Sequence, residues 1–365
     1  MKKNIIALAV AAAVAAPASA IADTTLYGKI HASYDFWGGD VAENADYSLA
    51  SNSSRIGIKG KEAVSDNLSL IYQWETQVDW GGSGEGIGEN PRNTFVGFNG
   101  NWGTAIFGRH DTPFKDVRGK YDLFGDTIGD ARSILRGRSV GGSDNNWDQR
   151  YNNTVAYITP DVGGFQATVA YVSDTEADIN NNSDAISANA SYEMGGFGII
   201  AGYEQHNRSA VAGEEDSQNA YRVAAQYKMG GFKVMGLYQG VENVNYMTES
   251  QANAQGANVY GGEMDMWGAG AAYSFGKSTV KAHYFTASEV DSVADSGANL
   301  WAIGYDYKLS KQTKVYVAYA AMSNESAIRS YAVGYKTGHG ESAAVDTADL
   351  GNDNNAFSVG VVHKF

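Results

Sequence analysis

Short segments in which apolar and polar residues alternate recur along the chain from residue 24 to its end. In the first segment Leu26, Ile30 and Phe36 fall on one face, and Lys29 and Asp35 fall on the other. Alternation with a period of two is typical of a β-strand whose faces meet different surroundings. The pattern predicts sixteen strands, at residues 24–37, 54–62, 67–79, 92–99, 104–112, 150–159, 164–173, 185–194, 197–206, 219–229, 232–240, 264–275, 278–288, 298–309, 312–321 and 356–365.

The connections between these strands alternate between short turns and long polar loops. Asp66-Asn67 and Gly195-Gly196 are short turns, and the motif Gly-Gly-Phe recurs at 163–165, 195–197 and 230–232. Seven short turns and eight long loops join sixteen strands, with both chain ends on the side of the short turns. Consecutive strands joined this way run antiparallel.

An even number of alternating strands, with aromatic residues near their ends and long loops on one side, is typical of outer-membrane barrels. A sheet crosses a bilayer only when it closes, because every backbone polar group there must be bonded internally. A soluble all-β protein is the alternative, but its sheets bury their apolar faces against each other and rarely need sixteen strands. We therefore expect an all-β fold, a 16-stranded antiparallel transmembrane β-barrel.

The N-terminus has the layout of a secretory signal peptide. Lys2 and Lys3 precede an apolar run from Ile5 to Ala16, which is shorter than the ~20 apolar residues of a membrane-spanning helix. Small residues follow, and cleavage after Ala20 or after Ala22 fits them equally well. The predicted domains are a signal peptide at 1–22 and a barrel at 23–365.

Composition removes several other classes of protein. The 365 residues include no Cys, which excludes disulfides, thiolate zinc sites and iron–sulfur clusters. With 27 Lys and Arg against 41 Asp and Glu, the chain lacks the basic balance that nucleic-acid binding requires. Its six His show no pair at metal-ligand spacing, so we expect no metal site and no cofactor.

Several short motifs carry a resemblance to a known family. They are Leu26-Tyr27-Gly28-Lys29, Ser54–Gly60, Arg92–Phe98, Phe107-Gly108-Arg109, Arg150–Tyr157 and the ending Phe357–Phe365. In this order over the whole mature chain, they resemble the Gram-negative general porins. The resemblance implies a homotrimeric barrel in the outer membrane, whose long third loop folds into the lumen and whose terminal Phe365 is recognised by the barrel-assembly machinery. The family's Pro-Glu-Phe-Gly-Gly motif in that loop is absent, and Tyr121–Asp130 stands in its place.

Strand parity places four cations on the polar, lumen side of the barrel: Lys29, Arg55, Arg92 and Arg150. Parity is informative because an Arg or Lys facing the bilayer midplane costs roughly 2–4 kcal/mol. Arg109 breaks the rule by sharing the parity of Phe107, which a bulge or a position among the lipid headgroups explains.

The long connection 113–149 holds as many basic as acidic residues and several apolar ones, among them Phe114, Phe124 and Ile134. Loops of this length without structure of their own are uncommon unless they are functional. The hypothesis is that its carboxylates oppose arginines of the wall across the narrowest section, so that a transverse field orients polar solutes. The expected acids are Asp122, Asp126 and Asp130, facing Arg55, Arg92 and Arg150.

The expected function is passive diffusion of small hydrophilic solutes and ions through a water-filled outer-membrane channel, not an enzymatic reaction. Two alternatives stay open, a substrate-specific channel and an outer-membrane barrel phospholipase with a dispersed Ser/His/Asp triad. Ion preference also stays open, because the wall is basic while the seven other long loops hold 23 acidic and 3 basic residues. Those acidic loops would lie beside lipopolysaccharide, and whether they bind divalent cations there also stays open.

Overall fold

The computed structural model describes residues 24–40, 47–80, 86–137, 147–173, 184–207, 217–243, 262–291, 293–327, 331–335, 337–343 and 350–365. The signal peptide at 1–22 lies outside these residues and stays a prediction. Most of the acidic residues of the long loops also lie outside them. Within the described ranges, no helix is long and apolar enough to cross a membrane.

Strands make up most of the described chain, and two short helices, α2 (Pro113–Gly119) and α3 (Arg132–Leu135), interrupt them. The strands are β1 (Thr25–Gly39), β2 (Tyr47–Ser51), β3 (Arg55–Ser65), β4 (Leu68–Val78), β5 (Ile87–Pro91), β6 (Thr94–Gly100), β7 (Gly103–Asp111), β8 (Arg150–Ile158), β9 (Phe165–Val172), β10 (Asp184–Met194), β11 (Phe197–Asn207), β12 (Ser217–Met229), β13 (Phe232–Glu242), β14 (Glu263–Phe275), β15 (Ser278–Ala287), β16 (Ala298–Lys308), β17 (Thr313–Asn324) and β18 (Asn354–Lys364).

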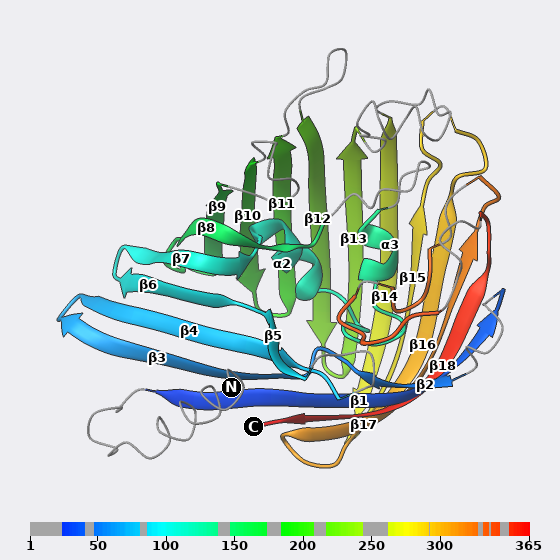
Figure 1. Ribbon diagram of the computed structural model, residues 1–365, viewed down its shortest axis with the longest axis horizontal. Helices are drawn as coiled ribbons and strands as arrows, with labels where there is room; N and C mark the ends of the chain where they lie inside the picture. Colours follow the sequence, from blue (N-terminus) through cyan, green and yellow to red (C-terminus); the bar gives the residue numbers. More distant parts are fainter. Residues whose placement is uncertain are drawn as a thin grey trace.

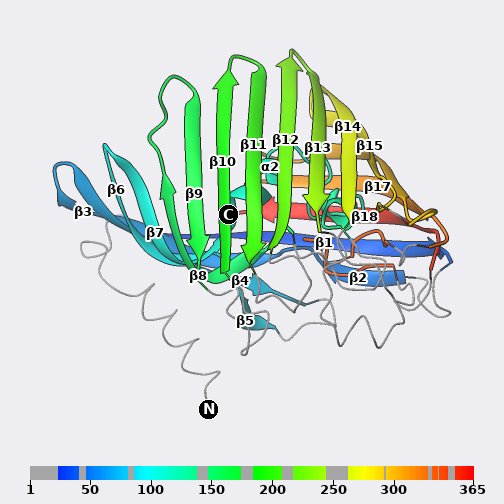
Figure 2. The same ribbon diagram turned by 90° about the horizontal axis from the view of Figure 1, so that it is seen from above.

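These strands form sixteen spans of one closed antiparallel barrel (Figure 1 and Figure 2). β2 and β3 both pair with β1, so they are two parts of one span, and β5 and β6 both pair with β4 in the same way. β18 pairs with β17 on one edge and with β1 on the other, which closes the ring. The sixteen predicted strands and their antiparallel order are confirmed.

The seam between the two chain ends is closed by the terminal residue. Gly28 and Phe365 exchange backbone hydrogen bonds, with N···O distances of 3.0 and 3.2 Å. The Phe365 ring lies against Gly28 at the place that a Cβ would occupy, so this position of β1 takes glycine alone. Phe365 therefore has a structural place in the seam, whatever recognises it during assembly.

The two faces of each strand differ as the alternation predicts. On β1, Leu26 and Phe36 are 45% and 47% exposed on the outer face, whereas Lys29 and Asp35 are 5% and 0% exposed on the inner face. The exception, Arg109, lies within the β-bulge between Gly108 and His110, and its guanidinium donates to Asn152 and to the Pro91 carbonyl. The bulge is one of the two explanations that the sequence leaves open.

The apolar core of the protein lies inside the ring. Phe114, Phe124, Ile134 and Leu135 of the connection between β7 and β8 are fully buried. They pack against small and flexible inward residues of β11–β18, including Ala224, Met235, Leu237, Met266, Leu300 and Ala302. Figure 1 and Figure 2 show α2 within the ring, as this packing requires. The long connection thus folds into the lumen.

Candidate channel constriction

Loop 3, residues 112–149 between β7 and β8, enters the lumen through α2. Thr112 is the N-cap of this helix, because its side chain accepts a hydrogen bond from the Lys115 N–H and Pro113 takes the first turn. The wall holds the helix start from the other side, since Asn189 of β10 donates to the Pro113 carbonyl at 2.7 Å. The loop therefore has a fixed direction from its first turn.

A buried ion cluster joins other described residues of loop 3 to the wall. Asp148, near the end of the loop, accepts from Arg118 of α2 at 2.9 Å and from Arg222 of β12 at 2.6 Å. Arg222 is fully buried, and its guanidinium lies 4.1 Å from the centre of the Phe114 ring. Removing one partner of such a group leaves a buried charge without compensation, which costs about 3–5 kcal/mol.

Two of the three predicted loop acids belong to this cluster. Asp122 and Asp130 both accept from Arg118 Nη1, at 3.0 and 2.9 Å, and each carboxylate is only 1% exposed. Asp122 also accepts from the Phe124 and Ala131 N–H groups, at 2.8 and 3.0 Å. Their carboxylates shape the loop from within and do not face the arginines of the wall, which corrects the expectation for both residues.

The third predicted acid, Asp126, reaches the wall. Its carboxylate lies 2.6 Å from Lys29 Nζ on β1 and remains 33% exposed. Asp126 has a positive φ of 61°, and its N–H donates to Asp130 at 2.8 Å, so the buried cluster holds the tip in place. Burial works to raise the pKa of Asp126, but the contact with Lys29 outweighs it and holds this pKa below its usual range. The Asp126 carboxylate is therefore ionised at neutral pH.

The four predicted wall cations form a row across consecutive spans, with acids between them. Lys29 and Arg55 are register partners on β1 and β3. Arg55 and Arg92 share Glu75 of β4, with N···O distances of 3.7 and 2.6 Å. Arg150 of β8 pairs with Asp111 at 2.8 Å, and Lys115 of loop 3 reaches the same carboxylate at 2.6 Å.

The structure thus pairs wall cations with carboxylates, as predicted, but the partners differ from the predicted ones. Of the predicted acids, Asp126 alone meets the row, and its partner is Lys29 instead of Arg55, Arg92 or Arg150. The arginines pair with Glu75 and Asp111, which lie on the strands themselves. Glu75 has inward parity in the sequence, so this signal could have identified it as a partner for the arginines.

A second connection also enters the lumen, and the sequence did not predict it. This is loop 8, residues 325–353 between β17 and β18, of which residues 325–327, 331–335, 337–343 and 350–353 are described. Tyr331, Ala332 and Val333 are buried, and Gly340 donates to Asn52 beside β2 at 2.9 Å. Gly338 approaches the Asp126 carboxylate so closely that a Cβ there would overlap it. The two inward loops therefore meet at Asp126.

His339 attaches loop 8 to β1. His339 Nε2 lies 3.2 Å from Asp35 and 3.3 Å from Ser33 Oγ, and all three residues are buried. These residue types also form hydrolase triads, in which the acid and the serine contact opposite ring nitrogens. Here both contact Nε2, while Nδ1 lies 2.6 Å from the Glu341 carbonyl. These contacts attach loop 8 to β1, and their geometry is not that of a triad.

Groups of His, Asp and Glu that could hold a metal ion do not occur within the described residues. Two inward histidines instead contact aromatic residues of loop 3: His206 stacks on Trp147 at 4.4 Å between ring centres, and His283 lies 4.5 Å from Phe124. These contacts add to the packing of loop 3 on the wall.

Comparison with known proteins agrees with this architecture. A model of the Gram-negative porin family matches residues 7–327. Outer membrane porin protein 32 of Delftia acidovorans is 30% identical over 338 residues, which cover 90% of this chain and 91% of that protein.

Two solved structures have a similar fold. The anion-selective porin from Comamonas acidovorans has a TM-score of 0.73 at 24% identity, covering 94% of this chain and 99% of that one. The trimer form of in-vitro folded OmpT, an outer membrane protein of Vibrio cholerae, has a TM-score of 0.67 at 21% identity over 94% and 99% of the chains.

The different places of the loop acids predict different effects of their neutralisation. We expect Asp126→Asn to raise the preference for anions over cations roughly two- to fivefold, because one charge at contact distance in water is worth about 1 kcal/mol. Asp122→Asn is the control: its carboxylate is buried, so the variant should lower thermal stability and leave the ion preference within about 20% of the parent. Reversal potentials in a salt gradient measure both, and equal shifts in the two variants would contradict the assignment.

The attachment of loop 8 to β1 through His339 gives a second prediction. We expect His339→Ala to raise the mean single-channel conductance and its fluctuation, because loop 8 loses its contact with Asp35 and Ser33. His363→Ala is the control, since His363 contacts Thr313 on the strands and not the inward loops. A conductance unchanged by His339→Ala would show that His339 does not hold loop 8 in the lumen.

Proposed function

Because the chain belongs to the Gram-negative porin family, we propose that small hydrophilic solutes and ions diffuse passively through its lumen, which loop 3 and loop 8 narrow. The chain is an outer-membrane porin, and its closed barrel supplies the channel wall. The observation that carries the proposal is the row of inward cations from Lys29 to Arg150, which the partly exposed carboxylate of Asp126 on loop 3 meets at Lys29. Charged groups in a narrow lumen select solutes by sign, and the lumen's diameter selects them by size.

We further propose that the constriction favours anions. Glu75, Asp111 and Asp126 only partly compensate the four positive charges of Lys29, Arg55, Arg92 and Arg150. The acidic balance of the whole chain does not contradict this, since most of the excess acid belongs to the long loops. The similar structure from Comamonas acidovorans is described as an anion-selective porin, and this description also supports the proposal.

We also propose that the protein catalyses no chemical reaction. The buried Ser33, Asp35 and His339 have the residue types of a hydrolase triad, but both Ser33 and Asp35 contact the same ring nitrogen of His339, which suits attachment of loop 8 to β1 better. A passive channel needs no cofactor. These three residues therefore give no support to the phospholipase alternative.

The assembly and the partners are proposed chiefly from membership of the family. We propose a homotrimer, lipid and lipopolysaccharide around its apolar outer face, export by a signal peptide cleaved after Ala20 or Ala22, and recognition of Phe365 by the barrel-assembly machinery. The outward aromatic residues support a lipid-facing surface, and the similar OmpT structure is described as a trimer form.

The test is the purified full-length porin in a planar bilayer with a tenfold gradient of KCl. We expect stepwise ohmic currents and a reversal potential with the sign of chloride preference, because the constriction is basic. Arg92→Gln should reduce that potential, since it removes one positive charge from the row. A potential of the opposite sign would overturn the anion preference, and release of fatty acid from the bilayer lipid on addition of calcium would favour the phospholipase.

A further inference from the structure

Two inward lysines differ from the other cations of their wall. Lys29, Arg92 and Arg150 each have a carboxylate within 3 Å. By contrast, Lys59 Nζ lies over the Tyr27 ring, 5.1 Å from its centre, and Lys61 Nζ donates to the Asn99 side chain at 2.9 Å. Both partners are neutral, and no described carboxylate forms an ion pair with either lysine. Two exposed positive charges are therefore uncompensated at one place.

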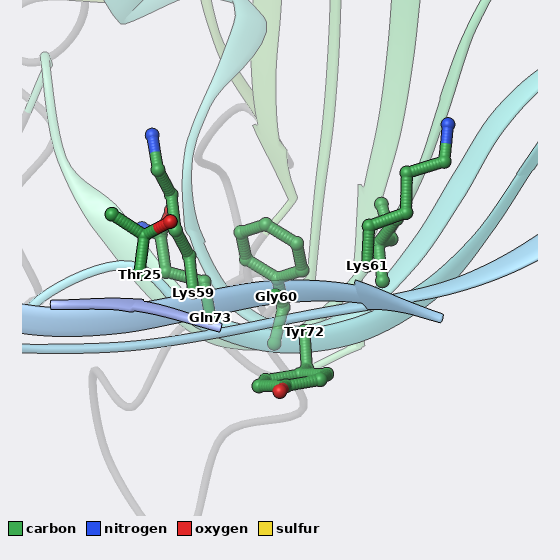
Figure 3. Close-up of a pocket in the computed structure, with 8 residues that line it drawn as sticks. Thr25, Lys59, Gly60, Lys61, Tyr72 and Gln73 are labelled. Carbon is green, nitrogen blue, oxygen red and sulfur yellow. The ribbon is translucent and has the colours of Figure 1, made fainter. Parts of the chain in front are cut away.

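These lysines border a hollow in the lumen face of the sheet. The hollow has a volume of about 290 Å³, and its lining residues are Thr25, Lys59, Gly60, Lys61, Ile71, Tyr72, Gln73 and Phe95. Figure 3 shows Lys59 and Lys61 rising from one face of the sheet while Tyr72 projects from the other. Tyr72 has the outward parity of Trp74, so the lysines point into the lumen.

The floor of the hollow is partly apolar. Ile71 and Phe95 are partly buried there, and they pack against the inward residues Ile106, Ala156 and Ala170. This packing keeps the Phe95 ring in place and leaves part of it exposed to the lumen. The hollow thus combines two amino groups with an apolar surface, the combination typical of small-molecule sites, whose volumes begin near 300 Å³.

The hollow lies beyond the constriction on the path through the channel. β3 runs from Arg55, in the row of cations, to Ser65 beside the short turn at Asp66-Asn67. Four to six residues of strand separate Arg55 from the lysines, which is roughly 13–20 Å at ~3.3 Å per residue. Short turns of such barrels lie on the periplasmic side. A solute that has passed the row therefore meets the hollow before it leaves.

We propose that this hollow is a binding subsite for small organic anions with an apolar body, of which an aromatic monocarboxylate is the simplest. The carboxylate contacts Lys59 or Lys61, and the ring lies on Phe95 and Ile71. An inorganic anion uses only the charges, and an aromatic cation only the floor, so neither matches the site. The inference rests on the proposed function, because the ligand reaches the hollow through an open lumen.

The experiment is single-channel recording of the full-length protein in KCl, with sodium benzoate added on the side of the short turns. We expect benzoate to reduce the current in a saturable way, and equal concentrations of acetate or of benzylammonium to leave it unchanged. The double variant Lys59→Gln/Lys61→Gln should raise the half-blocking concentration of benzoate at least about fivefold. Lys228→Gln is the matched control: Lys228 shares the inward parity of Arg222 at the short-turn end of β12, and is not among the residues that line the hollow.

The outcomes separate this subsite from the proposed function. An unchanged benzoate block in the double variant, or an equal weakening by Lys228→Gln, would overturn the subsite, since diffuse charge would then account for the block. A block by acetate as strong as that by benzoate would remove the role of Phe95 and Ile71. Absence of channel currents in the unmodified protein would instead count against the proposed function.

Discussion

The need to pair every backbone N–H and C=O group inside a bilayer determines this structure. β1 meets this need by pairing with β18 on one edge and with β2 and β3 on the other, and closure then gives the sheet one outer and one inner face. Apolar side chains occupy the outer face, so polar and small side chains fill the inner one. The core of this fold therefore lies in the lumen, as it would in a soluble barrel, and a loop must supply a large part of that core.

Loop 3 supplies this part of the core because ionic contacts and apolar contacts both hold the same segment against the wall. Asp148 joins Arg118 of the loop to Arg222 of the wall, while Phe114 and its apolar neighbours fill the space between the small residues of the far strands. The cost of burying these charges is met only when all of them are paired, which favours one position of the loop. That position holds Asp126 against Lys29 and leaves the row of cations beside the remaining passage.

The strands could be predicted from the sequence, and so could the side of the sheet on which each wall cation lies. A single alternation is weak evidence. All four wall cations, however, have the parity of the lumen face, as expected because a charge that faces the lipid is costly. These cations are Lys29, Arg55, Arg92 and Arg150. The roles of Asp122 and Asp130 could not be predicted, because a loop has no parity and Arg118 is brought to both of them only by folding. Loop 8 was missed for the same reason: the contact of His339 with Asp35 joins residues that are about 300 positions apart.

A cross-link between loop 3 and the wall tests the central claim, that this loop is fixed inside the lumen, most directly. Gly202 of β11 faces Val117 of α2 so closely that a Cβ on Gly202 would lie 2.7 Å from a Val117 methyl group, and the chain has no Cys of its own. In the variant Val117→Cys/Gly202→Cys we expect a disulfide to form in the folded barrel, with single-channel conductance and reversal potential equal before and after its reduction. Failure of the cross-link to form, or a conductance that changes markedly on reduction, would contradict a loop held permanently against β11.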